Sequence, residues 1–188
     1  MKLELKNITK HFGEKNALND VSITAKSGHA FGLLGRNGAG KTTTIRILMN
    51  VFKANTGEIL LNDKLLDYQN ISFGYLPEER GLYPKEKILD QLVYLAKLKG
   101  MSKPDAIQSI DYWLDFLDMT KYRNKKLDTL SKGNQQKIQL ISSIAHNPDI
   151  VVFDEPFSGL DPVNARLLEN VVKEQIRRTK LSFFLAIR

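Results

Sequence analysis

The chain contains no cysteine, so no disulfide can stabilise its fold, and a reducing compartment suits it. It also lacks any run of about eighteen apolar residues, the length that a helix needs to cross a bilayer. Its first five residues, Met-Lys-Leu-Glu-Leu, alternate charged and apolar side chains, unlike the apolar stretch of a secretory signal. We therefore expect one globular domain of 188 residues, whose association with any membrane depends on a partner protein.

Acidic residues are in the minority: 28 lysines and arginines against 21 aspartates and glutamates give a net charge of +7. The densest basic stretch comprises Lys121, Arg123, Lys125, Lys126, Lys132 and Lys137. Such a stretch can attract nucleic acid or an anionic membrane, or it can be a solvated surface that also favours anionic nucleotides. It lacks the repeated aromatic residues of a base-stacking platform. We therefore favour the solvated surface and expect no nucleic-acid partner.

Hydrophobic periodicity predicts alternating strands and helices. Two-residue alternation and short apolar runs predict strands at residues 2–9, 20–26, 30–34 and 150–153, with two more within 57–76 around a turn at 62–63. Apolar residues at helical spacing predict helices at residues 45–49, 89–98, 107–117, 138–145 and from 161 onward. Short buried strands that alternate with helices indicate an α/β fold with a parallel core sheet.

A glycine-rich loop follows the predicted strand at 30–34 and precedes a predicted helix. Gly35, Gly40, Lys41 and Thr42 satisfy the phosphate-loop pattern in full. Glycines let backbone N–H groups approach phosphates, and the helix N-terminus adds partial positive charge. Lys41 is placed to neutralise the β- and γ-phosphates, and the Thr42 hydroxyl to ligate Mg²⁺. The predicted nucleotide-binding residues are Gly35, Arg36, Asn37, Gly38, Ala39, Gly40, Lys41, Thr42 and Thr43.

Two carboxylates follow the apolar strand at 150–153. Ligands of open α/β sheets lie beyond the carboxyl ends of the strands, so Asp154 and Glu155 are candidate site residues. Asp154 would hold Mg²⁺, directly or through water, and Glu155 would polarise the attacking water. An acidic turn facing solvent is the alternative, and the phosphate loop in the same chain weighs against it.

Residues 130–137 read Leu-Ser-Lys-Gly-Asn-Gln-Gln-Lys. Taken alone, they are typical of an N-capped helix. They also resemble the signature sequence of ATP-binding-cassette (ABC) proteins, Leu-Ser-Gly-Gly-Gln followed by Gln and a basic residue, and they stand shortly before the acidic strand, as in that family. Together with residues 77–84, Pro-Glu-Glu-Arg-Gly-Leu-Tyr-Pro, the wording is most similar to bacterial export-type cassettes of the sodium-efflux and drug-efflux kind.

This resemblance, which covers essentially the whole chain, implies the fold of an ABC-type P-loop nucleotide-binding domain. The expected parts are a mixed-sheet core with an antiparallel β subdomain, formed by residues 1–84 and 131–188, and an inserted α-helical subdomain at 85–130. Residues 1–188 would form one such domain, incomplete at its C-terminus.

The resemblance also assigns roles to further residues. Phe12 stands where the family carries an aromatic side chain that stacks on adenine, although a plain core position is equally compatible with the sequence. Glu78 takes the place of the family's glutamine ligand for Mg²⁺ and the attacking water; a glutamate in a surface turn is the alternative. Residues 158–161, with Asp161, resemble the loop that crosses to the other subunit.

The implied function is an ATPase subunit that drives a membrane exporter. Two nucleotide-binding domains, identical or different, would pack head to tail. Each ATP, with Mg²⁺, would lie between the phosphate loop of one copy and Ser131, Gly133 and Asn134 of the other. A polytopic permease subunit would hold the pair in the cytoplasm, at the inner face of the cell membrane.

The C-terminal segment departs from the family, which places a histidine after the strand that follows the helix beginning near 161. None of His11, His29 and His146 can take that place, and Ala186 stands nearest to it. A permitted codon string for residues 181–188 encodes Val-Ile-Phe-Leu-Ser-His-Gln in another frame, so a shifted frame is one hypothesis and truncation the other. We expect residual ATP binding with weak or absent hydrolysis.

Two other functions fit parts of this pattern. A soluble cassette that acts on nucleic acid or the ribosome shares the motifs, but such proteins usually join two cassettes in one chain. A nucleotide-binding interaction module with little hydrolysis would follow from the missing histidine.

Overall fold

The computed structural model describes residues 1–78, 81–157 and 161–177 and the backbone of residues 181–185. The strands are β1 (Lys2–Phe12), β2 (Lys15–Lys26), β3 (Ala30–Leu33), β4 (Thr56–Leu61), β5 (Lys64–Leu65), β6 (Phe73–Leu76), β7 (Ile150–Asp154) and β8 (Leu181–Leu185). The α-helices are α1 (Lys41–Leu48), α2 (Ile88–Leu98), α3 (Lys103–Phe116), α4 (Lys132–Ile144) and α5 (Pro162–Arg177), and short 3-10 helices lie at Thr120–Tyr122 and Leu127–Thr129. None of the described helices is both long and apolar enough to cross a membrane.

The N-terminal strands form an antiparallel sheet in the order β2-β1-β4-β5. The predicted turn at Asn62 and Asp63 is confirmed: both have positive φ, 50° and 62°, which the tight hairpin between β4 and β5 requires. The second predicted strand stops after two residues, because the Asp67 carboxylate accepts hydrogen bonds from the Gln69 N–H and the Asn70 amide and closes a local turn. A separate strand, β6, then follows.

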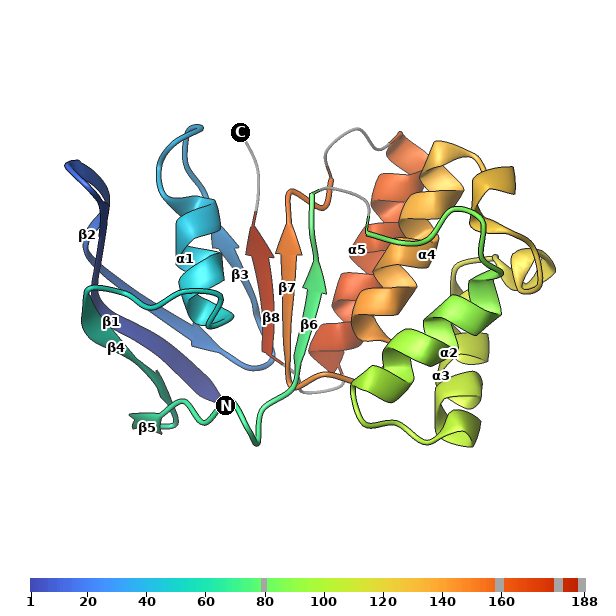
Figure 1. Ribbon diagram of the computed structural model, residues 1–188, viewed down its shortest axis with the longest axis horizontal. Helices are drawn as coiled ribbons and strands as arrows, with labels where there is room; N and C mark the ends of the chain where they lie inside the picture. Colours follow the sequence, from blue (N-terminus) through green and yellow to red (C-terminus); the bar gives the residue numbers. More distant parts are fainter. Residues whose placement is uncertain (79–80, 158–160, 178–180, 186–188) are drawn as a thin grey trace.

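A parallel sheet in the order β3-β8-β7-β6 forms the centre of the molecule (Figure 1). Every residue of β7 is buried, because its two faces pack against different cores. Ile150 and Val152 join the apolar residues of α1 and the antiparallel sheet, whereas Val151 and Phe153 join the helices α2–α5. The unbroken apolar run of β7 is therefore the pattern of a parallel strand covered on both sides.

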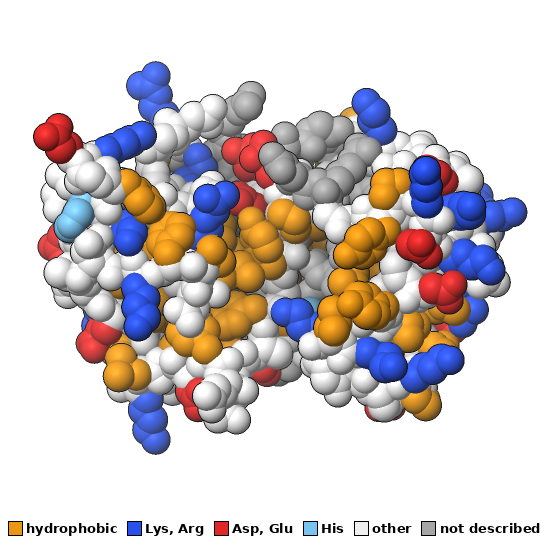
Figure 2. All heavy atoms as spheres, in the orientation of Figure 1, with side chains coloured by type: hydrophobic (Ala, Val, Ile, Leu, Met, Phe, Trp, Pro, Cys, Tyr) orange, Lys and Arg blue, Asp and Glu red, His pale blue; other side chains and the backbone are white. Residues whose placement is uncertain are grey.

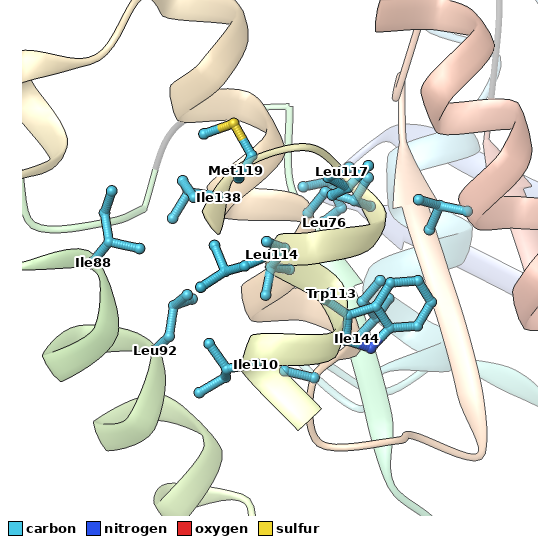
Figure 3. Packing of buried hydrophobic residues seen from close by; sticks show 14 of the residues in the cluster. Leu76, Ile88, Leu92, Ile110, Trp113, Leu114, Leu117, Met119, Ile138 and Ile144 are labelled. Atoms are coloured by element: carbon cyan, nitrogen blue, oxygen red, sulfur yellow. The ribbon is translucent and has the colours of Figure 1, made fainter. Parts of the chain in front are cut away.

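The inserted helices share a core with the central sheet rather than forming a separate one. Figure 3 shows Trp113 and Leu114 of α3 packed among side chains of α2 and α4, and Leu76 of β6 belongs to the same cluster. Trp113 is 1% exposed and is among the largest fully buried side chains of the described residues. Ser102 begins α3 by accepting a hydrogen bond from the Asp105 N–H, and Pro104 occupies the first turn.

The topology brings distant segments to one edge of the parallel sheet. Because its strands run in the same direction, the segments after β3, β6 and β7 all emerge at the edge drawn at the top of Figure 1. They carry the phosphate loop, Glu78 and the acidic pair. A C-terminal strand that the periodicity did not predict, β8, lies between β3 and β7, whereas Ala186 lies outside the described residues.

Candidate functional site

The phosphate loop ends at Gly40, which caps the N-terminus of α1 with φ 85°. A Cβ at this position would come within 2.5 Å of Leu18 Cδ2 and 2.7 Å of the Ala17 carbonyl oxygen. Both the left-handed backbone and the lack of space therefore require glycine here. The first turn of α1 contains no acidic residue, so the positive end of the helix faces the loop without a carboxylate to neutralise it.

The Lys41 side chain folds back over this loop. Its Nζ donates hydrogen bonds to the carbonyl oxygens of Gly35, at 2.5 Å, and Arg36, at 3.2 Å. Thr42 is exposed beside it, and the Thr44 hydroxyl donates to the Gly40 carbonyl oxygen at 3.0 Å. The loop thus holds an ammonium group against its own carbonyl oxygens, close to the positive end of α1.

A hollow of about 420 Å³ lies beside the loop. The residues that line it are Phe12, Lys15, Ala17, Asn37, Gly38, Gly40, Lys41, Thr42, Thr43, Glu78 and Glu155. The structure therefore brings together, around one space, candidates that lie on β1, on the phosphate loop and after β6 and β7. Gly35, Arg36 and Ala39 belong to the same loop without lining the hollow.

Phe12 lies at the rim of this hollow and not in the core. Its side chain is 50% exposed. Phe52 contacts it edge to face, with 5.5 Å between ring centroids and 86° between the ring planes. Lys10 Nζ lies 5.1 Å from the Phe12 centroid and 5.2 Å from the Phe52 centroid. A half-exposed ring held by a neighbouring aromatic and a cation is suited to stacking on a planar ligand.

The acidic pair stands at the end of β7, where the chain turns sharply. Asp154 is 6% exposed, and its Oδ2 accepts a hydrogen bond from the Tyr75 hydroxyl at 3.2 Å. Burial raises the pKa of Asp154, while the Tyr75 hydrogen bond acts in the opposite direction. Glu155 has φ 48°, an uncommon conformation for a non-glycine residue, and lines the hollow together with Lys41.

A second hollow of about 350 Å³ adjoins the first. Thr42 and Glu78 line both hollows, and Asp154 and Tyr75 line only the second. Figure 2 shows hydrophobic side chains gathered in the middle of the face that is turned to the viewer, between the antiparallel sheet and the helices. Ile45, Met49 and Val51 contribute apolar side chains to the second hollow.

The donor set fits Mg²⁺. Thr42, Glu78 and Asp154 offer hydroxyl and carboxylate oxygens, the ligands that this hard cation prefers. Among the described residues, no group of three or more His, Asp or Glu side chains is placed to hold a metal ion by itself. Mg²⁺ is commonly held by one or two protein groups together with substrate phosphates, and this sparse set matches that mode.

The signature residues lie elsewhere. Ser131 caps α4, accepting a hydrogen bond from the Asn134 N–H at 3.4 Å. Asp161 caps α5 and accepts from the N–H groups of Val163 and Asn164, both at 3.0 Å; hydrogen bonds from Asn164 hold the pKa of Asp161 below its usual value. None of Ser131, Gly133, Asn134 and Asp161 lines either hollow of the same chain. Residues 158–160, the rest of the predicted crossing loop, lie outside the described residues.

Sequence reasoning missed Lys15, Ala17 and Tyr75. A signal for Lys15 was present: Gly13 and Glu14 form a tight turn, and Phe12 and Lys15 pair across it. Tyr75 had no such signal, because its position follows from the pairing of β6 with β7, which juxtaposes Tyr75 and Val152. Neither strand indicates this pairing in its own sequence.

The parallel sheet, the phosphate loop and the acidic pair define a P-loop nucleotide-binding protein. Comparison with known proteins refines this class. The pattern that defines the ABC transporter family matches residues 18–158, and the chain belongs to that family.

Individual relatives agree. An uncharacterized ABC transporter ATP-binding protein of Methanocaldococcus jannaschii is 51% identical over 173 residues, covering 92% of this chain and 63% of its own. An uncharacterized ABC transporter ATP-binding protein of Bacillus subtilis, YhaQ, is 49% identical over 171 residues, covering 90% of this chain and 57% of its own. The solved structure of an ATP-binding subunit of an ABC transporter superposes with a TM-score of 0.85 at 27% identity, covering 97% of this chain and 78% of that one. The chain thus spans less than two thirds of the length of these two sequence relatives.

Proposed function

We propose that this chain is the ATP-binding and hydrolysing subunit that powers a membrane exporter. The observation that carries the proposal is that Lys41, Thr42, Glu78 and Glu155 all line the first hollow, beside the phosphate loop. These are the groups that phosphoryl transfer from a nucleotide requires: a cation for the phosphates, oxygen ligands for Mg²⁺, and a carboxylate to act on water. Export rather than import rests on the resemblance of the motifs to export-type cassettes.

Within the hollow each side chain takes a distinct part. Lys41 exchanges its contacts with the Gly35 and Arg36 carbonyl oxygens for the phosphates, and the amides at the start of α1 add further donors. Thr42, Asp154 and Glu78 would hold Mg²⁺, which would supply positive charge beside the phosphates when bound. Glu155 orients and polarises the attacking water.

A second copy of the domain completes the site. Ser131, Gly133 and Asn134 stand at the start of α4, on the far side of the molecule from α1 and at the same edge of the sheet (Figure 1). Head-to-tail packing of two copies places this helix N-terminus, with its partial positive charge, over the γ-phosphate bound to the other copy. Asp161 lies at the start of α5 beside this contact. ATP thereby joins the two copies, and hydrolysis separates them.

Transport requires a membrane partner. We infer that residues 85–130 form the helical subdomain and that, with residues 74–84, it contacts a polytopic permease, which keeps the pair at the cytoplasmic face of the membrane. The second hollow supports this contact with a permease. Its apolar side chains could receive a partner segment next to Glu78 and Asp154, the proposed Mg²⁺ ligands.

Replacing Phe12 with alanine is expected to weaken ATP binding by about fivefold or more, since base–aromatic stacking contributes roughly 1–3 kcal/mol. Binding of inorganic tripolyphosphate should not change, because the phosphate loop is untouched. Competition titrations with a fluorescent nucleotide measure both. Phe12→Trp retains a stacking face and serves as the control; equal losses for ATP and tripolyphosphate would contradict the stacking role.

The proposed function is tested by titrating the purified chain with Mg-ATP and following its oligomeric state by gel filtration. We expect saturable binding and an ATP-dependent dimer. Expression in the cell with an affinity tag should recover a polytopic membrane protein rather than RNA. A folded chain without affinity for Mg-ATP would refute the proposal.

A further inference from the structure

Tyr75 is a conspicuous polar side chain at the site to which the family motifs give no role. We propose that Tyr75 is a positioning residue, whose hydroxyl fixes the Asp154 carboxylate in the orientation that ligates Mg²⁺. This inference rests on the proposed function, since it concerns the same metal ligand.

The register of the parallel sheet places the two residues in reach. Tyr75 pairs with Val152, and Val152 and Asp154 point to the same face of β7 because they are two residues apart. The Tyr75 hydroxyl extends along this face and donates to Asp154 Oδ2 at 3.2 Å. The phenol would thereby restrict rotation of the carboxylate that is proposed to hold Mg²⁺.

The surroundings of Asp154 make this contact significant. Asp154 is 6% exposed, so most of its surface is covered by protein. No ion pair among the described residues involves Asp154, although Arg46 lines the same hollow. A buried carboxylate with one fixed neutral donor keeps its negative charge available to a cation, whereas an ion pair would neutralise it.

The phenol acts as the donor in this contact. An ionised carboxylate has acceptors only, so the hydrogen bond from Tyr75 to Asp154 keeps one direction. A fixed outer partner of this kind orients a metal ligand and commonly changes metal affinity by about 10- to 100-fold.

The experiment compares Tyr75→Phe with Tyr68→Phe. Each variant retains the ring and removes one hydroxyl; the Tyr68 hydroxyl donates to the Leu48 carbonyl oxygen at 3.0 Å and lines neither hollow. Mn²⁺ replaces Mg²⁺ as the probe, and free Mn²⁺ is counted by electron paramagnetic resonance in the presence of a non-hydrolysable ATP analogue. Binding of the same analogue in EDTA reports the metal-independent part.

For Tyr75→Phe we expect Mn²⁺ affinity to fall about tenfold while binding in EDTA stays within about twofold of the unmodified chain. Tyr68→Phe should match the unmodified chain in both measurements. Unchanged Mn²⁺ affinity in Tyr75→Phe overturns the inference, and so does an equal loss in the two variants, which would reveal a purely structural effect. Failure of the unmodified chain to bind the analogue with Mn²⁺ instead overturns the proposed function, and this inference with it.

Discussion

Replacing Lys41 with alanine is expected to weaken Mg-ATP binding roughly 30-fold, about 2 kcal/mol, because charge-assisted hydrogen bonds to the phosphates are lost. Isothermal titration at fixed ionic strength measures the change. The effect should be large because the Lys41 ammonium lies directly over the carbonyl oxygens of Gly35 and Arg36, at the centre of the loop.

The control for this prediction is Lys64→Ala. Lys64 is exposed on β5, in the antiparallel sheet, and its removal lowers the net charge by the same amount. If general attraction between a basic protein and a polyanion governed binding, the two variants would lose affinity equally. We expect Lys64→Ala to remain within about twofold of the unmodified chain. Near-equal losses would contradict a specific grip by the loop.

Glu155→Gln should separate binding from chemistry. The amide keeps the size of the side chain but cannot accept a proton from water, so the residual hydrolysis expected of the unmodified chain should fall by at least about 100-fold. Affinity for Mg-ATP should stay within about twofold, and the ATP-dependent dimer should persist longer on gel filtration. Single-turnover hydrolysis with the chain in excess over radiolabelled ATP is the appropriate assay, because it detects slow rates.

A matched variant for this experiment is Glu86→Gln, which makes the same chemical change at an exposed residue between β6 and α2. It should hydrolyse ATP at the rate of the unmodified chain. A Glu155→Gln chain that turns over at that rate would falsify the assignment of Glu155 as the group that acts on water.

Much of this site could be predicted from local sequence. The loop from Gly35 to Thr43 carries its own glycines, its lysine and its helix start, so its chemistry needs no distant residue. Asp154 and Glu155 could also be predicted, because the apolar run of β7 indicates where a central strand ends. The hairpin at Asn62 and Asp63 follows from residues that tolerate positive φ.

Other features depend on pairing between distant segments, which no short window of sequence encodes. The contact between Tyr75 and Asp154 requires β6 to lie beside β7, although β7 begins 77 positions after β6 in the sequence. The position of Phe12 at a rim and not in a core depends on the turn into β2 and on Phe52, which packs against it. The short β5 is followed by a turn in which the Asp67 carboxylate accepts hydrogen bonds from Gln69 and Asn70. Hydrophobic periodicity does not predict such a hydrogen-bonded turn.

Gly133 and Asn164 show how two helix starts can act as one mechanical part. The Asn164 amide donates to the Asp161 cap at 2.6 Å and fills the space that a Cβ on Gly133 would take, 2.9 Å from Asn164 Nδ2. The first turns of α4 and α5 are thus in contact at Gly133, where a Cβ would meet the hydrogen-bonded Asn164 amide. In the proposed dimer, a displacement of one of these turns would therefore be transmitted to the other.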